Sequence, residues 1–273
     1  MEFQDKYILI SGGSSGIGLA LSKKFASLGA NITIIARRKE LLESAVRDIK
    51  AAAINEKQQF NWISADVSNY DDLDQALSKD KTDYDILINS AGISYPGEFV
   101  KMDPIVFKNV IDIDYLGTVY LTKLIVPRMI NKRSGYIVNL SSYVALVGYY
   151  GYTAYAPPKY AVRGFSRTLR PELKPYGIDV SVVFPQDTET PQLIFERAHL
   201  PAITRKANLL IEKVFGSSSL ISAEKAAEYI IQGMLKKKFS IYFGTVGLLT
   251  SYITPLIDKF LYRYTVNLAK KSM

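Results

Sequence analysis

A serine, a tyrosine and a lysine in the middle of the chain have the types and the spacing that proton transfer needs. Ser142 precedes Tyr155 by thirteen residues, and Lys159 follows Tyr155 by four. If the last two share a helix they lie on one face, where the ammonium favours the phenolate over the phenol. Tyr155 could then donate a proton to a carbonyl oxygen that Ser142 holds by a hydrogen bond. The three residues predict acid catalysis on a carbonyl group.

A glycine-rich turn near the N-terminus supplies the second half of this chemistry. It follows the apolar run at residues 7–10, and glycines let a backbone approach a pyrophosphate closely and adopt positive φ angles. If a helix begins near Gly16, its free N–H groups and its dipole face the phosphates. We therefore expect this turn to bind a dinucleotide. The residues predicted to contact it are Gly12, Ser14, Ser15, Gly16, Ile17 and Gly18.

The elements that position these residues follow from alternating patterns. Short apolar runs alternate with longer helical patterns, which is typical of a parallel sheet covered on both faces. N-cap residues Asp103 and Ser222 each predict the start of a helix, the first of which should run toward Arg133. We predict an α/β fold, with one doubly wound Rossmann-type domain over residues 1–273. Its seven parallel strands are expected at residues 7–11, 31–36, 59–64, 86–89, 136–140, 178–184 and 240–243.

Composition excludes several other kinds of catalysis. The chain of 273 residues is 48% hydrophobic, which is ample for one large core. It contains no cysteine and one histidine, so a Ser-His-Asp triad, a catalytic thiolate and a Cys- or His-rich metal site are not expected. The N-terminus does not read as a secretion signal, so we expect a cytoplasmic protein.

Positive charge is concentrated in the last quarter of the chain. The net charge is +8, and residues 205–273 carry 11 Lys and Arg against 4 Asp and Glu, which leaves residues 1–204 nearly balanced. These basic residues interleave with an apolar tract and not with a nucleic-acid-binding motif. We therefore expect attachment to an anionic membrane surface, and no nucleic acid partner.

Two apolar segments follow the sixth predicted strand. Residues 187–220 are expected to form a mobile lid over an apolar substrate, with a pair of ordinary packed helices as the alternative. Residues 245–273 are expected to form an apolar, amphipathic helical tail that lies in a membrane interface. Burial of the tail against the domain or a partner subunit is the second reading, and a membrane span, which Pro255 would kink, is the third.

Two arginines after the second predicted strand indicate which dinucleotide is bound. NAD sites usually place a carboxylate there for the ribose 2'-hydroxyl, whereas NADP sites use a cation for the 2'-phosphate. This position carries Arg37 and Arg38 and no acid. Arg37 can make charge-assisted hydrogen bonds to a phosphate, with Arg38 and Ser14 as weaker candidates. We expect NADPH/NADP+, the alternative being that both arginines are solvated loop residues.

Several motifs together resemble the short-chain dehydrogenase/reductase family over residues 5–245. The glycine spacing departs from the usual GxGxxG, residues 89–92 resemble the family's NNAG segment, and residues 142, 155 and 159 match its Ser and YxxxK. Residues 185–190 resemble its PGxxxT segment, although Gln186 replaces the glycine. The resemblance implies an NAD(P)-dependent oxidoreductase, often a homo-oligomer. It also implies further cofactor contacts at Asp66, Val67, Asn89, Ala91, Gly92, Tyr155, Lys159, Pro185, Thr188 and Thr190.

The chain departs from the family pattern at two places near the predicted site. The family's fourth catalytic position, an Asn, corresponds to Asp114, which could contribute a backbone carbonyl to a water relay or hold the Lys159 ammonium with its carboxylate. Pro157 and Pro158 separate the catalytic tyrosine from the lysine. Proline costs about 3 kcal/mol inside a helix, so the helix start is expected to shift or bend.

Three short segments resemble one subgroup of the family, the 3-ketodihydrosphingosine reductases. They are residues 151–155, 173–176 and 184–191. The resemblance implies NADPH-dependent reduction of the 3-keto group of a long-chain sphingoid base at the cytoplasmic face of a membrane, the endoplasmic reticulum in a eukaryote. A steroid, retinoid or 3-oxoacyl thioester substrate is the second reading. A cofactor-binding scaffold with little turnover is the third.

Overall fold

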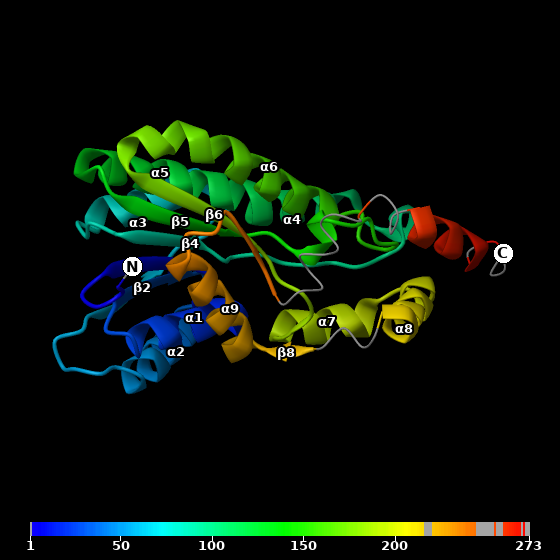
Figure 1. Ribbon diagram of the computed structural model, residues 1–273, viewed down its shortest axis with the longest axis horizontal. Coiled ribbons are helices and arrows are strands. Elements are labelled where there is room, and N and C mark those ends of the chain that lie inside the picture. Colours follow the sequence, from blue (N-terminus) through cyan, green and yellow to red (C-terminus); the bar gives the residue numbers. More distant parts are fainter. Residues whose placement is uncertain (1, 216–219, 244–253, 255–258, 269, 271–273) are drawn as a thin grey trace.

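Seven parallel strands form the main sheet, with helices on both of its faces (Figure 1). Their order is β3-β2-β1-β4-β5-β6-β9, so the direction of winding reverses between β1 and β4. Ligands of such sheets bind outside the carboxyl ends of the strands at this reversal. A computed structural model describes the chain at residues 2–215, 220–243, 254, 259–268 and 270.

The central strands are short apolar segments buried on both sides, whereas the edge strand at residues 60–64 is only partly buried. β1, β4 and most of β2 are buried because helices cover both faces of the sheet. All seven predicted strands are present, four of them with the predicted bounds and the others within one residue at either end. They are β1 (Tyr7–Ser11), β2 (Asn31–Ala36), β3 (Phe60–Ser64), β4 (Ile86–Asn89), β5 (Gly135–Leu140), β6 (Ile178–Phe184) and β9 (Ser240–Tyr242).

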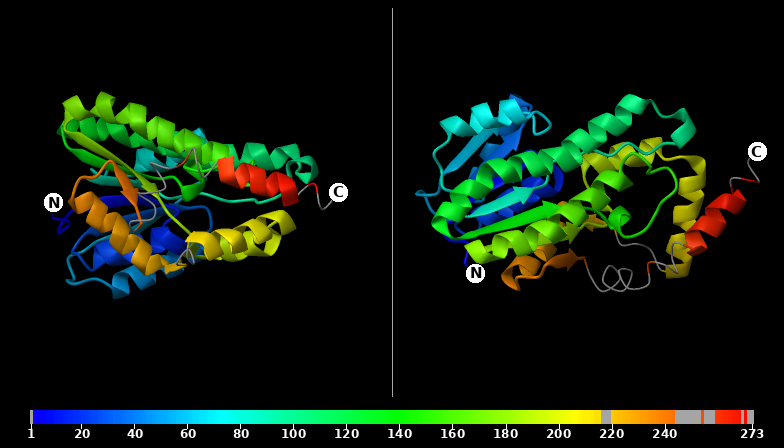
Figure 2. Two further views of the ribbon diagram at one scale, coloured as in Figure 1. Left: turned by 45° about the vertical axis from the view of Figure 1, so that its right-hand side comes forward. Right: turned by 90° about the horizontal axis from the view of Figure 1, so that it is seen from above.

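Two helical layers enclose two main apolar cores. One core packs α1 (Gly16–Ala26), α2 (Lys39–Ala51) and α9 (Ala223–Leu235) against one face. The other packs α3 (Tyr70–Lys79), α5 (Gly117–Lys132) and the end of α6 (Ala156–Leu173) against the opposite face. The view from above in Figure 2 shows how these helices lie along the strands. The predicted Rossmann-type architecture is confirmed.

The long helix predicted after Asp103 is present but is not uniform. Asp103 accepts a hydrogen bond from the N–H of Ile105 at 2.9 Å, and α4 (Pro104–Ile111) begins there. A π-helical segment, η2 (Asp112–Leu116), then joins α4 to α5. π segments inside helices often occur at functional sites, and this one contains Asp114.

The prolines between the catalytic tyrosine and lysine occupy the first turn of a helix. Tyr155 is the N-cap of α6, so Pro157 and Pro158 lie where a helix has unpaired N–H groups in any case. The Lys159 N–H donates to the Tyr155 carbonyl oxygen at 3.4 Å, which begins the regular helix. Because α6 begins at Ala156, both prolines fit in its first turn, in agreement with the predicted shift of the helix start.

The segment predicted as a lid folds into short, regular elements. It contains β7 (Thr188–Glu189), α7 (Pro191–His199) and α8 (Ala202–Phe215), and β7 pairs with β8 (Ile221–Ser222) just beyond it. Figure 1 shows α7 and α8 beyond the carboxyl ends of the strands. Opening of this segment stays a prediction. The remaining short helices are η1 (Phe99–Lys101), η3 (Tyr143–Ala145) and η4 (Lys174–Tyr176).

Most of the predicted tail, residues 245–273, lies outside the described residues. In its described part, residues 259–268 are helical and combine a buried Leu261 with the basic residues Lys259 and Arg263. The predicted apolar helix is therefore not found among the described residues of the tail, whose helical stretch carries charge. Among the described residues, no helix has the length and apolar content that crossing a bilayer requires.

Candidate active site

The glycine turn folds as a phosphate-binding turn requires. Gly12 and Gly16 have φ angles of +67° and +53°, which side chains rarely tolerate. A Cβ at Gly12 would lie 2.9 Å from the Ala91 backbone, and a Cβ at Gly18 would lie 2.3 Å from the Gly12 carbonyl oxygen. Ser15, the N-cap of α1, makes no capping hydrogen bond, so the side chain leaves the first N–H groups of that helix free. This surface can accept a pyrophosphate.

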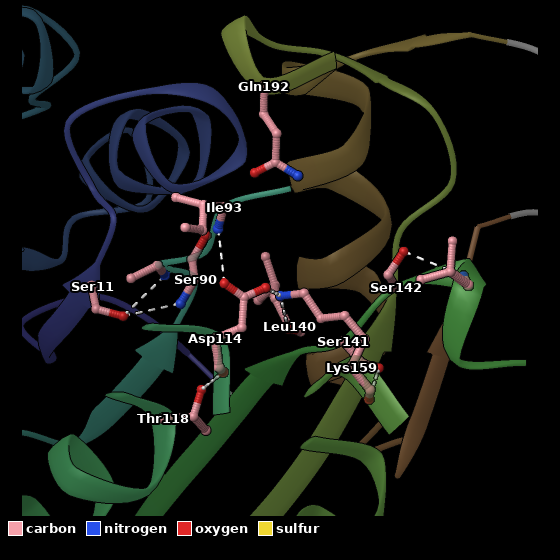
Figure 3. A network of polar contacts seen from close by, with 12 residues as sticks. Ser11, Ser90, Ile93, Asp114, Thr118, Leu140, Ser141, Ser142, Lys159 and Gln192 are labelled. Carbon is pink, nitrogen blue, oxygen red and sulfur yellow. Dashed lines mark hydrogen bonds and ion pairs between the residues drawn. The ribbon is translucent and has the colours of Figure 1, made fainter. Parts of the chain in front are cut away.

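Ser11 joins the glycine turn to the loop after β4. Its hydroxyl oxygen accepts hydrogen bonds from the N–H groups of Ser90 at 3.1 Å and Ala91 at 3.2 Å (Figure 3). Beside it, the Asn89 side chain donates to Asn139 at 2.8 Å and to a threonine of α5, so it ties strands to a helix. The predicted cofactor residues 89 and 91 therefore lie at one end of the sheet with the glycine turn. Sequence reasoning did not identify Ser11.

Arg37 lies directly after β2, but it is not isolated. Its guanidinium lies 3.6 Å from the carboxylate of Asp66, and its side chain is 61% exposed. Asp66 also accepts hydrogen bonds from Ser68, which holds the loop after β3. Exposure leaves Arg37 free to turn toward a phosphate, since exposed ion pairs are weak. Arg38 is the exposed N-cap of α2.

The other predicted cofactor residues lie at the same end of the sheet. The Thr190 methyl group would lie 3.1 Å from a Cβ at Gly16, and the Thr190 hydroxyl oxygen accepts the Leu193 N–H and caps α7. Pro185 accepts a backbone hydrogen bond from Tyr143, the first residue of η3. The remaining predicted residues take part in packing or in turns. Ile17 packs against the core below α1, and Val67 belongs to the core on the opposite face of the sheet. Thr188 donates a hydrogen bond to the Gln186 carbonyl oxygen, and Ser14 lies in the glycine turn.

Ser142, Tyr155 and Lys159 meet at the carboxyl end of β5. Ser142 follows that strand, and its hydroxyl lies close enough to the Tyr155 phenol, which is 7% exposed, to lower the pKa of that phenol. The Lys159 ammonium lies 5.5 Å from the centre of the Tyr155 ring. Ser141 anchors this arrangement, because its hydroxyl donates to the Lys159 carbonyl oxygen at 2.8 Å. The structure brings together the three residues predicted to act on a carbonyl group.

Asp114 uses its carboxylate and not its backbone carbonyl to reach this group. Its Oδ2 lies 3.0 Å from the Lys159 ammonium, and its Oδ1 accepts the Ile93 N–H at 2.8 Å. Its backbone carbonyl oxygen accepts the Thr118 hydroxyl at 2.9 Å, as Figure 3 shows. Gly92 lets the pair form, because a Cβ there would lie 3.1 Å from the ammonium. The geometry therefore favours a carboxylate that holds Lys159.

Burial and charge set the acidity of these groups. Burial raises the pKa of Tyr155 to about 12, although the Lys159 ammonium and the Ser142 hydroxyl lower it. Burial lowers the pKa of Lys159, but the Asp114 carboxylate, Tyr155 and Glu196 together outweigh burial and raise it. At neutral pH the phenol is therefore protonated and the lysine is charged. This is the state in which Tyr155 can act as an acid.

A second buried carboxylate, which sequence reasoning missed, lies close to the same phenol. Glu196 on α7 is 9% exposed and accepts hydrogen bonds from the Tyr152 hydroxyl at 3.1 Å and the Gln192 amide at 3.0 Å. The rings of Tyr152 and Tyr155 lie 6.2 Å apart, and the charge of Glu196 raises the pKa of Tyr155. Its position depends on the packing of α7, so no local motif could reveal it.

The fold and the site together define a class of protein. A glycine turn at the first strand can hold a dinucleotide, and a phenol flanked by a serine and a lysine lies at the same edge of the sheet. Such a site interconverts a carbonyl and an alcohol with a nicotinamide dinucleotide as the second reactant. The molecule is thus a nucleotide-binding oxidoreductase that acts on CH–OH or C=O groups.

Known proteins agree with this class. Residues 6–200 match the short chain dehydrogenase family, and the chain belongs to it. A 3-dehydrosphinganine reductase of Danio rerio is 33% identical over 93% of this chain and 76% of its own length. A 3-ketodihydrosphingosine reductase of Mus musculus is 34% identical over 91% and 74%. The solved structure of a levodione reductase shares the fold, with a TM-score of 0.79 at 23% identity over 92% of this chain and 99% of that one.

Proposed function

We propose that this chain reduces 3-ketodihydrosphingosine to dihydrosphingosine with NADPH. The observation that carries the proposal is the convergence of Ser142, Tyr155 and Lys159 at the edge of the sheet where the glycine turn lies. The reductases of Danio rerio and Mus musculus named above support the choice of ketone, because those proteins are 33–34% identical over nine tenths of the chain.

The reaction needs one proton from the protein for each ketone reduced. When bound, the nicotinamide dinucleotide supplies a hydride to the carbonyl carbon. Tyr155 donates its phenolic proton to the carbonyl oxygen, which Ser142 orients through a hydrogen bond. The Lys159 ammonium stabilises the phenolate that remains, and Asp114 keeps this ammonium charged within a buried site.

Arg37 supports the choice of NADPH over NADH. Its position after β2 is where a 2'-phosphate lies in folds of this kind, and its ion-pair partner within the described residues is the partly exposed Asp66. A phosphate carrying two charges would compete well with one carboxylate for the guanidinium. Arg37→Glu should therefore raise the KM for NADPH by about tenfold or more, while the KM for NADH falls or stays level.

Exposed apolar side chains near the lid support a long-chain substrate taken from a membrane. Val100 and Phe99 of η1, Ile194 of α7 and Leu209 of α8 are between 64% and 84% exposed. These helices and residues 259–268 gather at one end of the molecule (Figures 1 and 2). An apolar end of this kind suits a lipid surface, with the basic last quarter of the chain attracted to anionic headgroups. We place this end at the cytoplasmic face of a membrane; assembly into a homo-oligomer stays a prediction.

A panel of ketones tests the proposed function. Initial rates of NADPH oxidation should give the highest kcat/KM for 3-ketodihydrosphingosine, above a steroid, a retinoid and a 3-oxoacyl thioester. A clear preference for one of the other ketones would replace the substrate and leave the chemistry. Tight NADPH binding with no turnover of any ketone would overturn the enzymatic assignment in favour of a scaffold.

A further inference from the structure

Glu196 differs from the other carboxylates around the site because it is buried without a cation. It is 9% exposed, and its two hydrogen-bond donors, Tyr152 and Gln192, are both neutral. The ion pairs within the described part of the chain all involve other acids, including Asp114 with Lys159 and Asp187 with Arg197. A buried carboxylate that lacks a counter-ion is costly, so its negative charge favours any cation that can enter.

A second buried polar group, a serine hydroxyl, lies beside Glu196 and makes no close hydrogen bond within the described part of the chain. The Ser94 hydroxyl faces the Glu196 carboxylate and is 2% exposed. Its oxygen makes no hydrogen bond to any group among the described residues. Most buried polar groups in proteins are hydrogen-bonded, so a hydroxyl without a close hydrogen bond, beside a carboxylate without a counter-ion, indicates a position for a ligand atom. The two groups come from different elements, the loop after β4 and helix α7.

These groups lie beside the position where the ketone is reduced. Tyr152 links them to the catalytic phenol, since its hydroxyl donates to Glu196 and its ring packs 6.2 Å from that of Tyr155. The negative charge of Glu196 raises the pKa of both Tyr155 and Lys159, which places it within electrostatic reach of the reacting atoms. Figure 3 shows Gln192, the other donor to Glu196, pointing from its helix toward the network around Lys159.

We propose that Glu196, with the Ser94 hydroxyl, binds a positively charged amine that the substrate carries next to its ketone. This inference rests on the proposed function, because 3-ketodihydrosphingosine is an α-amino ketone whose ammonium group is bonded to the carbon beside the carbonyl. The carboxylate accepts N–H hydrogen bonds from the ammonium, and the Ser94 oxygen accepts another. Glu196 thereby distinguishes amino ketones from neutral ketones of the same length.

The contact between Glu196 and Tyr152 could instead serve only to hold α7 against the loop before α6. Glu196→Gln separates the two roles, because glutamine keeps the volume and an oxygen that can accept the Tyr152 hydroxyl. The variant removes the charge and replaces one of the two accepting oxygens with an amide NH2, so the hydrogen bond from Gln192 is lost while that from Tyr152 can remain. Glu98→Gln is a matched control, since it removes a partly exposed carboxylate that pairs with Lys101 at the surface.

The test compares two substrates in the full-length enzyme, namely 3-ketodihydrosphingosine and its analogue with a hydroxyl in place of the amine. Glu196→Gln should lower kcat/KM for the amine by about ten- to a hundredfold, mainly through KM, and change that for the neutral analogue by less than about threefold. Glu196→Asp should recover part of the loss, and Glu98→Gln should behave as wild type. Equal losses on both substrates would overturn the proposal in favour of a structural role.

A binding measurement keeps this proposal separate from the proposed function. With NADP+ present, dihydrosphingosine and its 2-hydroxy analogue are titrated calorimetrically into the wild type and Glu196→Gln. The wild type should bind the amine about tenfold more tightly than the analogue, and the variant should bind both alike. If the wild type shows this preference but reduces no sphingoid ketone, only the proposed function fails. If the wild type reduces the amino ketone without any preference for the amine, only the role of Glu196 fails.

Discussion

The floor of the site and its lid each bring a buried carboxylate close to the same phenol. On the floor, Asp114 in η2 pairs with Lys159 at 3.0 Å and accepts a backbone N–H. In the lid, Glu196 on α7 accepts hydrogen bonds from two neutral side chains and has no ion pair within the described residues. The floor carboxylate is therefore paired with a cation of the chain itself, whereas the lid carboxylate has none beside it among the described residues. Asp114 therefore holds the Lys159 ammonium beside the catalytic phenol, whereas Glu196 is suited to recognising a charged group of the substrate.

Tyr155→Phe should have the largest effect, because both carboxylates act around this phenol. Removal of a general acid typically lowers the rate by about 10²- to 10⁴-fold. We expect a loss of that size in kcat for ketone reduction, with NADPH affinity unchanged within about threefold because the glycine turn is intact. The measurement is steady-state NADPH oxidation together with NADPH fluorescence titration. A variant that keeps a tenth of the wild-type kcat would show that another group supplies the proton.

Lys159→Met tests the floor through stability. The substitution leaves the Asp114 carboxylate buried without its partner, which typically costs about 3–5 kcal/mol in the free energy of unfolding. The double variant Lys159→Met with Asp114→Leu removes the orphaned charge as well, and should recover at least half of the loss. Urea unfolding measures both. Additive losses in the double variant would mean that the two side chains do not interact.

Glu196→Gln tests the lid in the same way, with a smaller effect. Burial raises the pKa of Glu196, so the protonated carboxyl stabilises the fold below the unfolded value of 4.5, and this contribution is lost as the pH rises through the raised folded pKa. Glutamine has no such loss. The variant should therefore gain stability relative to wild type as the pH rises above 4.5, by at most about 1.4 kcal/mol per pH unit. Urea unfolding across this range measures the difference, and a fall in relative stability would contradict an unpaired carboxylate.

Asp179→Asn, far from the site, should have the smallest effect. Asp179 pairs with Lys174 at 2.6 Å and Lys237 at 3.0 Å, and although its partial burial opposes this, the lysines hold its pKa below the usual value. The ionised Asp179 therefore stabilises the fold at pH values above its pKa in the unfolded chain. This stabilisation is lost as the pH falls through its lower pKa in the folded protein. Exposed ion pairs contribute little to stability, so Asp179→Asn should lower the free energy of unfolding at pH 7 by less than about 1 kcal/mol. A loss as large as that of Lys159→Met would remove the distinction between buried and exposed pairs.

The sheet and the catalytic triplet could be predicted because their signals are local. Buried parallel strands are continuous apolar runs, so even Asn31–Ala36 and Ile178–Phe184 could be delimited from sequence. Tyr155 and Lys159 lie on one helix, where spacing alone brings them together. The prolines between them could be placed in the first helical turn only once the start of α6 was known.

The parts that sequence reasoning could not supply depend on contacts between distant elements. Glu196 approaches Tyr152 across 44 positions of the chain, and Ser11 reaches Ala91 across 80. Asp114 was identified, but the choice between its carbonyl and its carboxylate required the π segment that turns it toward Lys159. No periodicity in sequence encodes such contacts, because they arise when separate strand–helix units pack.

The most direct test is a stoichiometric reaction of the wild-type chain with NADPH and 3-ketodihydrosphingosine, followed by mass spectrometry of the lipid. We expect one dihydrosphingosine to form for each NADPH oxidised. A folded, NADPH-saturated protein that leaves this ketone unchanged, whatever the pH and lipid surface supplied, would contradict this expectation.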